Sequence, residues 1–381
     1  MMKRKFAILG LTAAACLGLA LGLAACTDNN ADNTGGGENG GGTTDDPVPV
    51  HVHRVSADSD GVCDDCHETL YEGSMGFTLS DNLKYYIANV SDCIGAVTVP
   101  DAYKGLGDEE YLPVLTLRLE VMFGCNELEA LHIPAKIESI EKGSGVVGKE
   151  ALTEVTVASE NTHYYVEGNA LFDADDELLL VWNIGETFTL PDKVDTIKTG
   201  MFSGDDTLVD LVIPSSVKTI ERESFSYCGN LRSVTFAEGS ALKALEMLTF
   251  GFCQNLTTVR LAEGLETIGD SAFSSCPLLT EVELPDSLKE IGMGTFNNCS
   301  ALSKLDIPDG LQVIGARAFL DSGIRELYLP ASLQTVGADI VGTEMPQSIV
   351  CHVPFAQGEI PDGWDSDWAG NSIVIYSDRG E

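Results

Sequence analysis

The chain has 381 residues, 44% of them hydrophobic and 21% charged, which is enough apolar material for a sizeable core. Its 59 acidic residues outnumber 22 basic ones, and the formal net charge is -37. A field of this sign repels phosphate backbones, so we expect no nucleic-acid partner.

The first residues have the layout of a secretory signal. Basic residues at positions 3 to 5 precede an apolar run from Phe6 to Leu23, and this charged-then-apolar order directs export. The segment Leu23-Ala24-Ala25-Cys26 resembles the lipobox of bacterial lipoproteins, in which the signal is cut before a cysteine that carries diacylglycerol. The resemblance implies a lipoprotein signal peptide over residues 1–25 and lipidation of Cys26.

Lipidation would attach the exported chain to the outer face of the bacterial cell membrane. Acyl chains contribute about 0.8 kcal/mol per buried CH₂, so several of them anchor a protein stably. No other stretch is long and apolar enough to span a bilayer, and we therefore expect membrane contact through the lipid anchor only. The alternative is an ordinary signal peptide cleaved near Ala25, with Cys26 unmodified.

Residues 26–50 begin with the lipidated cysteine and continue as a segment rich in Gly, Asn, Asp and Thr. With almost no apolar side chain, such a segment cannot offset the entropy lost on ordering. We expect a disordered acidic tether.

A small Cys/His module is expected over residues 51–75. His51, His53, Cys63 and Cys66 have ligand spacing, and two imidazoles with two thiolates can complete a tetrahedral structural zinc site. The run from Cys63 to His67 also matches the c-type haem attachment pattern. A disulfide between the two cysteines is a further alternative in an oxidising compartment. Aspartates at positions 58, 60 and 64 form a weaker calcium-loop pattern.

An internal repeat occupies most of the remaining chain. A phenylalanine recurs at separations of 23, 25, 23, 23 and 23 residues, at Phe202, Phe225, Phe250, Phe273, Phe296 and Phe319. Within each unit, apolar and polar residues alternate just before a proline, as at Val282 and Leu284 before Pro285. This alternation indicates a short strand with one buried face, and proline belongs at its end because it cannot donate to a ladder. Stacking of such units buries one continuous core.

The unit, a strand ending in Ile-Pro, then Ser-Leu-Lys-x-Ile-Gly, then Ala-Phe-x-x-Cys-x-x-Leu, resembles the BspA-type leucine-rich repeats of bacterial surface proteins. The match is clear over Pro191–Ile340 and looser back to about Gly76. The resemblance implies a repeat solenoid, α/β but β-rich, with repeats of about 23 residues and short parallel strands. We assign residues 76–343 to the solenoid and 344–381 to a C-terminal cap containing Trp364 and Trp368.

Four cysteines each lie three residues after a repeat phenylalanine, at Cys228, Cys253, Cys276 and Cys299. We expect buried thiols that act as small hydrophobes, and not a metal or redox row, because parallel side chains have poor geometry for disulfides. Cys93 and Cys351 have no evident partner.

Strand alternation also predicts which residues face outward, in two neighbouring rows. The first row is Val212, Thr235, Arg260, Glu283, Asp306 and Tyr328, and the second is Asp210, Ser233, Thr258, Glu281, Lys304 and Glu326. Solenoids bind partners on extended surfaces of this kind. The alternative is a solvated sheet whose cross-strand charges stabilise by roughly 0.2 to 1 kcal/mol each.

We do not expect an enzyme. The sequence has no His-Glu-x-x-His and no Gly-x-Ser-x-Gly, and the formal G-x-G-x-x-G at Gly143–Gly148 lacks the strand-loop-helix setting of a dinucleotide site. The resemblance implies adhesion to a protein partner on a host or neighbouring cell, through the outward sheet face. The competing function is a structural envelope scaffold that presents the Cys/His module.

Overall fold

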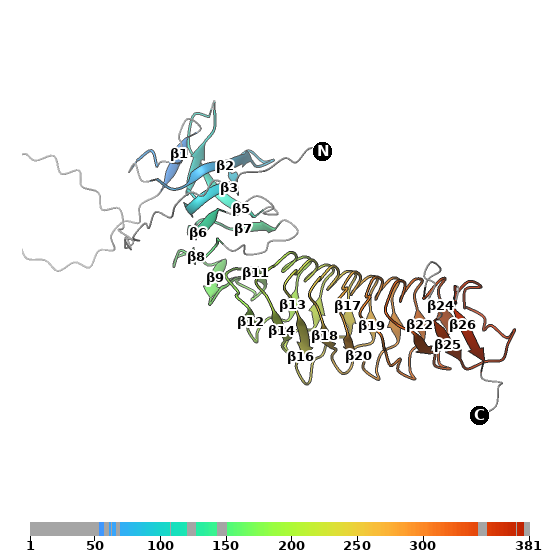
Figure 1. The fold of residues 1–381 in the computed structure, drawn as a ribbon. Coiled ribbons are helices and arrows are strands. Elements are labelled where there is room, and N and C mark those ends of the chain that lie inside the picture. The colour runs from blue at the N-terminus through green and yellow to red at the C-terminus, as the bar shows by residue number, and fades with distance from the viewer. Residues whose placement is uncertain are drawn as a thin grey trace, which may run out of the picture. The chain divides into compact units, whose positions relative to one another are not determined.

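The computed structural model describes residues 53–56, 61, 63–65, 69–106, 108–119, 127–142, 151–341, 349–370 and 372–376 (Figure 1). The chain divides into two units, Met1–Val52 and His53–Glu381, and every described residue belongs to the second. The predicted signal peptide, Cys26, the tether, His51 and Cys66 lie outside the described residues. Strands and turns make up the described residues, and we find no apolar helix of membrane-spanning length among them.

Eight strands form the first sheet: β1 (Arg54–Ser56), β2 (Glu72–Leu79), β3 (Tyr86–Thr98), β4 (Ala102–Lys104), β5 (Leu112–Leu119), β6 (Leu128–Ile133), β7 (Ser139–Lys142) and β8 (Glu154–Val157). The long strand β3 pairs in parallel with β5 through its first part and with β6 through its last part. β5 then pairs with β7 and β6 with β8, again in parallel. Two parallel ladders therefore diverge at β3, in the region where the repeat pattern is loose.

A three-stranded antiparallel sheet follows, formed by β9 (Tyr164–Glu167), β10 (Ala170–Asp173) and β11 (Leu178–Val181). Successive side chains of β10 point to opposite faces, and they join two different cores. Leu171 packs with the apolar residues of the first sheet, whereas Phe172 packs with those of the repeats. This sheet occupies the interruption that the sequence shows between its loose and its clear repeats.

Two parallel ladders run through the repeat array. The first contains β12 (Thr187–Thr189), β14 (Asp210–Ile213), β16 (Ser233–Phe236), β18 (Thr258–Arg260) and β20 (Glu281–Glu283). The second side of the array carries two-residue strands: β13 (Thr196–Ile197), β15 (Thr219–Ile220), β17 (Ala244–Leu245), β19 (Thr267–Ile268), β21 (Glu290–Ile291), β22 (Val313–Ile314) and β24 (Thr335–Val336). This second ladder is divided, since β13 pairs with β15 and the strands from β17 to β24 form a separate sheet. The predicted solenoid of parallel strands is confirmed. Turns take the place that helices would have in an α/β repeat, since none of the described residues is helical.

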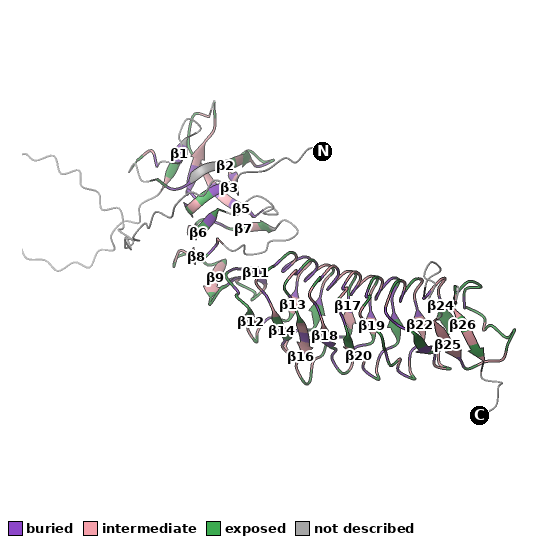
Figure 2. Ribbon diagram, viewed as in Figure 1, coloured by how far each residue is buried: buried purple, intermediate pink, exposed green. Residues whose placement is uncertain are grey.

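The six repeat phenylalanines form one stack through the centre of the array. All six side chains are fully buried. Successive ring centroids lie 4.8, 5.3, 5.5, 5.6 and 6.0 Å apart, with planes within 10° of parallel. Along the strands beside them, buried and exposed positions alternate (Figure 2), as in β14, where Leu211 and Ile213 are buried. Each repeat is thus covered by its neighbours.

A third ladder runs along the phenylalanine side of the array. Each of the first five repeat phenylalanines donates its N–H to the carbonyl of the residue before the next one, as from Phe225 to Thr249 at 2.9 Å, and the last, Phe319, donates to Ile340 at 2.7 Å. The residues two positions before and two after each phenylalanine have φ between 55° and 75°, and most are not glycine. These left-handed residues make the N–H groups of alternate residues point the same way, toward the following repeat.

The C-terminal segment closes this array. β23 (Glu326–Tyr328), β25 (Val350–Val353) and β26 (Ile373–Tyr376) form a parallel sheet. Trp364 and Trp368 are buried, with ring centroids 5.1 Å apart. The carbonyl of Trp368 accepts the N–H of Ile340 at 2.9 Å. The tryptophan segment therefore satisfies donors at the end of the third ladder.

The four cysteines that follow a repeat phenylalanine by three residues, Cys228, Cys253, Cys276 and Cys299, form a row in the core beside the phenylalanine stack. Each side chain is fully buried, and each thiol donates to the carbonyl of a repeat phenylalanine at 3.1 to 3.3 Å. Burial raises the pKa of the Cys299 thiol to about 12. A small side chain that can also donate a hydrogen bond suits this position, and a thiolate nucleophile does not.

Replacing Phe273→Ala tests the stack. The substitution should lower the free energy of unfolding by about 3–5 kcal/mol, because it removes a fully buried ring between two others and leaves a cavity. Urea unfolding followed by circular dichroism measures this, with the exposed Glu281→Ala as the control that should change stability by less than about 0.5 kcal/mol. Equal losses in both variants would contradict the role of the stack.

Alkaline pH tests the neutral thiols. The contribution of Cys299 to stability is fully present below about pH 9 and is lost as pH rises toward 12, because the unfolded chain loses the thiol proton first. We expect the free energy of unfolding to fall more steeply above about pH 9 in the wild type than in Cys299→Ala. Parallel slopes in urea titrations of the two proteins would show that the buried thiol makes no such contribution.

Candidate interaction surface

The structure places the predicted outward rows in register along the first ladder. Asp210 pairs with Ser233, Ser233 with Thr258, and Thr258 with Glu281. In the neighbouring row, Val212, Thr235, Arg260 and Glu283 pair in the same order. The threonines and Ser233 are half-buried, and the other members of these rows are exposed. Alternation in the sequence therefore identified the outward positions of these strands.

Charged side chains on this face pair along the array. Arg260 and Glu283 approach to 3.6 Å, with both side chains more than half exposed. The hydroxyl of Ser233 donates to Asp210 at 2.5 Å. Exposed ion pairs contribute about 0–1 kcal/mol to stability, so a partner could replace these contacts with its own at little energetic cost.

The rows are interrupted after β20. Lys304 and Asp306 are exposed as predicted, but they lie outside the strands, and their charged atoms approach to 2.7 Å. The register resumes at β23, which pairs with β25 and not with β20. The expected single sheet face is therefore two sheet faces with an exposed ion pair between them.

The second sheet face has a different chemistry from the first. The ring of Tyr328 stacks on His352, with centroids 4.2 Å apart and planes 6° from parallel. The carboxylate of Glu326 accepts a hydrogen bond from the Tyr328 hydroxyl at 2.9 Å, and its Oε1 lies 2.7 Å from Nε2 of His352. Ile373 and Ile375 continue the two outward rows beside this cluster, and they are 50% and 39% exposed.

These contacts perturb the titration of the cluster. The hydrogen bond from Tyr328, followed by that from His352, lowers the pKa of the Glu326 carboxyl. The same hydrogen bond raises the pKa of the Tyr328 hydroxyl. Glu326 is thus held as an anion that fixes the orientation of both rings.

Sequence reasoning missed His352, Ile373 and Ile375 as parts of this surface. They lie in the segment assigned to the cap, beyond the regular 23-residue spacing. The alternation of Ile373-Val374-Ile375-Tyr376 was a signal that could have placed two of them on an outward face.

Half of the predicted zinc ligands fall among the described residues. The backbone N–H of His53 donates to the Asp101 carboxylate at 3.0 Å, and Cys63 is buried in the core of the first sheet. Within the part of the chain that the structure describes, no three His, Cys, Asp or Glu side chains gather as metal ligands would. A zinc site that includes His51 and Cys66 stays a prediction.

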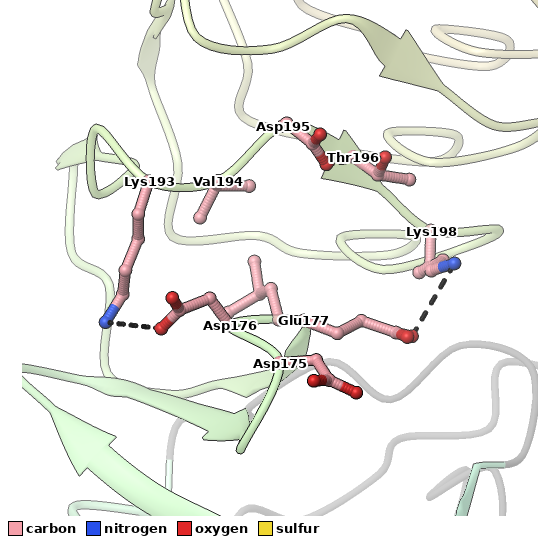
Figure 3. A pocket seen from close by; sticks show the side chains of 9 residues that line it. Asp175, Asp176, Glu177, Lys193, Val194, Asp195, Thr196 and Lys198 are labelled. Carbon is pink, nitrogen blue, oxygen red and sulfur yellow. Dashed lines mark hydrogen bonds and ion pairs between the residues drawn. The ribbon is translucent and has the colours of Figure 1, made fainter.

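A polar pocket of about 270 Å³ lies between the β10–β11 turn and β13 (Figure 3). Its two lysines each point to an acid: Lys193 lies 3.8 Å from Asp176, and Lys198 lies 3.5 Å from Glu177. Burial lowers the pKa of Lys193, but hydrogen bonds with Glu167 and Tyr165 outweigh it, and the pKa is raised overall. Acidic side chains of the β10–β11 turn pair with both lysines. We therefore assign these ion pairs a structural role, which is to hold this turn against the first repeats.

Comparison with known proteins places the repeats in a family. The model of the BspA type leucine rich repeat region matches residues 183–241 and 239–341, with six copies. No curated protein matches the sequence significantly.

Several solved structures are similar. A leucine-rich repeat protein from Eubacterium ventriosum is 21% identical, with a TM-score of 0.48, over 66% of this chain and 93% of that chain. One from Bacteroides ovatus is 18% identical, with a TM-score of 0.48, over 79% of this chain and 69% of that one. A leucine rich cell surface protein from Faecalibacterium prausnitzii is 19% identical, with a TM-score of 0.33, over 81% of this chain and 94% of that chain.

The family match and the fold agree on the same part of the chain. The matched residues contain the stacked phenylalanines, the buried cysteine row and both parallel ladders. Residues 183–341 are a BspA-type leucine-rich repeat region.

Proposed function

We propose that this protein is a lipid-anchored surface protein that binds a protein partner on a host or neighbouring cell through its outward sheet faces. The observation that carries the proposal is the cluster of Tyr328, His352 and Glu326 beside Ile373 and Ile375. It combines an exposed aromatic side chain, exposed aliphatic side chains and an oriented carboxylate on one face.

Such a composition suits a protein interface. Tyrosine is enriched among the residues that contribute most to binding, and it contributes best within an apolar patch surrounded by polar groups. The three strands β23, β25 and β26 supply the patch, and the charged rows of β14 to β20 supply a polar surface along one direction. The excess of acidic residues would speed association with a basic partner, mainly through the rate of encounter.

The first experiment uses the full chain against extracellular matrix proteins and whole-cell surface extracts. Bound proteins are quantified by mass spectrometry, and each candidate is then titrated by interferometry. Saturable binding of a purified partner would support the proposal. The absence of saturable binding to any of them would count against adhesion and favour the scaffold role.

The patch itself is tested by Tyr328→Ala. We expect at least tenfold weaker binding of the partner, because the substitution removes an exposed aromatic anchor and its stack on His352. Arg260→Glu, which reverses a charge on the polar surface and makes it more acidic, should mainly speed association with a basic partner, by about threefold. Met293→Ala removes a comparably exposed apolar side chain outside the rows and is the control. Unchanged affinity in Tyr328→Ala would remove this face from consideration.

Anchoring is tested separately by Cys26→Ala. In cells fed labelled palmitate, we expect the wild-type protein to carry label and to enter the detergent phase on partitioning. The variant should lose both properties, because the acyl chains supply the membrane affinity. A labelled, detergent-partitioning variant would show that Cys26 is not the lipidated residue.

A further inference from the structure

A second exposed aromatic feature lies on the third ladder, away from the outward rows. Tyr227 and Phe252 occupy the position two residues after the repeat phenylalanine, and their rings stack with centroids 4.6 Å apart and planes 2° from parallel. Tyr227 is 56% exposed even though Phe252 covers one face of its ring. The outer face of Tyr227 is therefore available to solvent.

Packing of the array does not require aromatic residues at this position. The backbone here is left-handed in every repeat, a conformation that disfavours bulky side chains. The other repeats carry small or polar residues there, namely Gly204, Ser275, Asn298 and Asp321. Tyr227 and Phe252 adopt the unfavourable conformation while leaving apolar area in water. Local departures of this kind are expected at functional sites.

The repeat before Tyr227 leaves the next place in this aromatic stack empty. Gly204 is the equivalent residue there, and its N–H donates to the carbonyl of Ser226 at 2.8 Å. A side-chain carbon on Gly204 would have no atom within 4 Å. The space above Gly204 and against the free face of Tyr227 can therefore take one flat group at stacking distance.

A carboxylate stands two residues further along the same turn. Asp206 is exposed, and its Oδ1 lies 2.6 Å from the point where a Cβ on Gly229 would stand. A side chain at position 229 would clash with this carboxylate, so Gly229 allows Asp206 to adopt its position. The side-chain amide of Asn230 donates to the Asp206 carbonyl at 2.6 Å and holds the turn.

The flat group that fits this setting is a cation. The face of an aromatic ring attracts positive charge, and a guanidinium both stacks on a ring and pairs with a carboxylate. The net charge of -37 favours a basic ligand further. We propose that the space above Gly204 binds an arginine side chain of a basic protein partner, stacked on Tyr227 and paired with Asp206. This site does not depend on the outward sheet faces.

The probe is a short acetylated peptide of four arginines, titrated into the full chain by calorimetry at physiological salt. Its lysine and citrulline counterparts separate stacking from charge, because lysine keeps the charge without the plane and citrulline keeps the plane without the charge. We expect the arginine peptide to bind more tightly than either. Equal binding of the arginine and lysine peptides would show adsorption through net charge and overturn the proposal, and equal binding of the citrulline peptide would overturn the cationic assignment.

The decisive variant is Gly204→Asn, which fills the empty place with a residue that this protein already uses at the same position, Asn298. It should fold normally and weaken the arginine peptide about fivefold. Asn298→Ser changes the same position in a repeat whose two neighbours carry Ser275 and Asp321 there, with no aromatic ring, and is the matched control. Tyr227→Asn should weaken binding as Gly204→Asn does.

Unchanged binding in both Gly204→Asn and Tyr227→Asn would overturn the proposal. Thermal melting of each variant excludes loss of the fold as the cause. Tyr328→Ala should leave the peptide affinity unchanged, so that failure of this site and failure of the outward sheet faces give different results.

Discussion

The array exists because each repeat is buried by the next. A single unit of about 23 residues cannot hide its own phenylalanine, since both faces of the ring are covered by the rings of adjacent units. The same stacking aligns the strands in register, and so it also places equivalent outward residues in rows. The stacking of the core therefore also sets the distance between equivalent outward residues of adjacent repeats, which equals the distance between neighbouring strands.

The stacked core determines the outward sheet faces and the exposed side of the third ladder in different ways. On the outward sheets, strand alternation leaves every second side chain toward solvent, so substitutions at these positions should cost folding little. On the third ladder, the backbone conformation favours small residues, so the aromatic pair at Tyr227 and Phe252 is an exception that folding opposes. Solvent-exposed aromatic rings occur on both. The hydroxyl of Tyr328 donates to the carboxylate of Glu326, whereas the carboxylate that we propose to act with Tyr227, that of Asp206, lies against Gly229.

The sequence predicted the periodic part of the fold well. The recurring Phe and Ile positions predicted the buried stack, and the residues before each proline predicted the register of the outward rows. The third ladder was not predictable, because residues such as Glu223 and Leu248 carry positive φ without the glycine that would signal it. Nor did the regular spacing reveal that the strand expected at Lys304–Asp306 does not form, because its residues alternate like the others. Of the candidate surface, Tyr328 was identified, whereas its neighbour His352 lies beyond the repeats.

The third ladder gives the array a direction. Its N–H groups point toward the C-terminal end and its carbonyls toward the N-terminal end, so its peptide dipoles align as in a helix but with the opposite sense along the chain. The two ends of an uncovered array would therefore be chemically unlike, one rich in donors and the other in acceptors. Asp367 and Trp368 supply carbonyls to the donor end and terminate it. Without them, the matching surface for that end would be the acceptor end of another copy, a head-to-tail contact that grows into open filaments and cannot close into a twofold dimer. The tryptophan segment thus occupies the donor edge on which a second copy could stack, as well as covering the core.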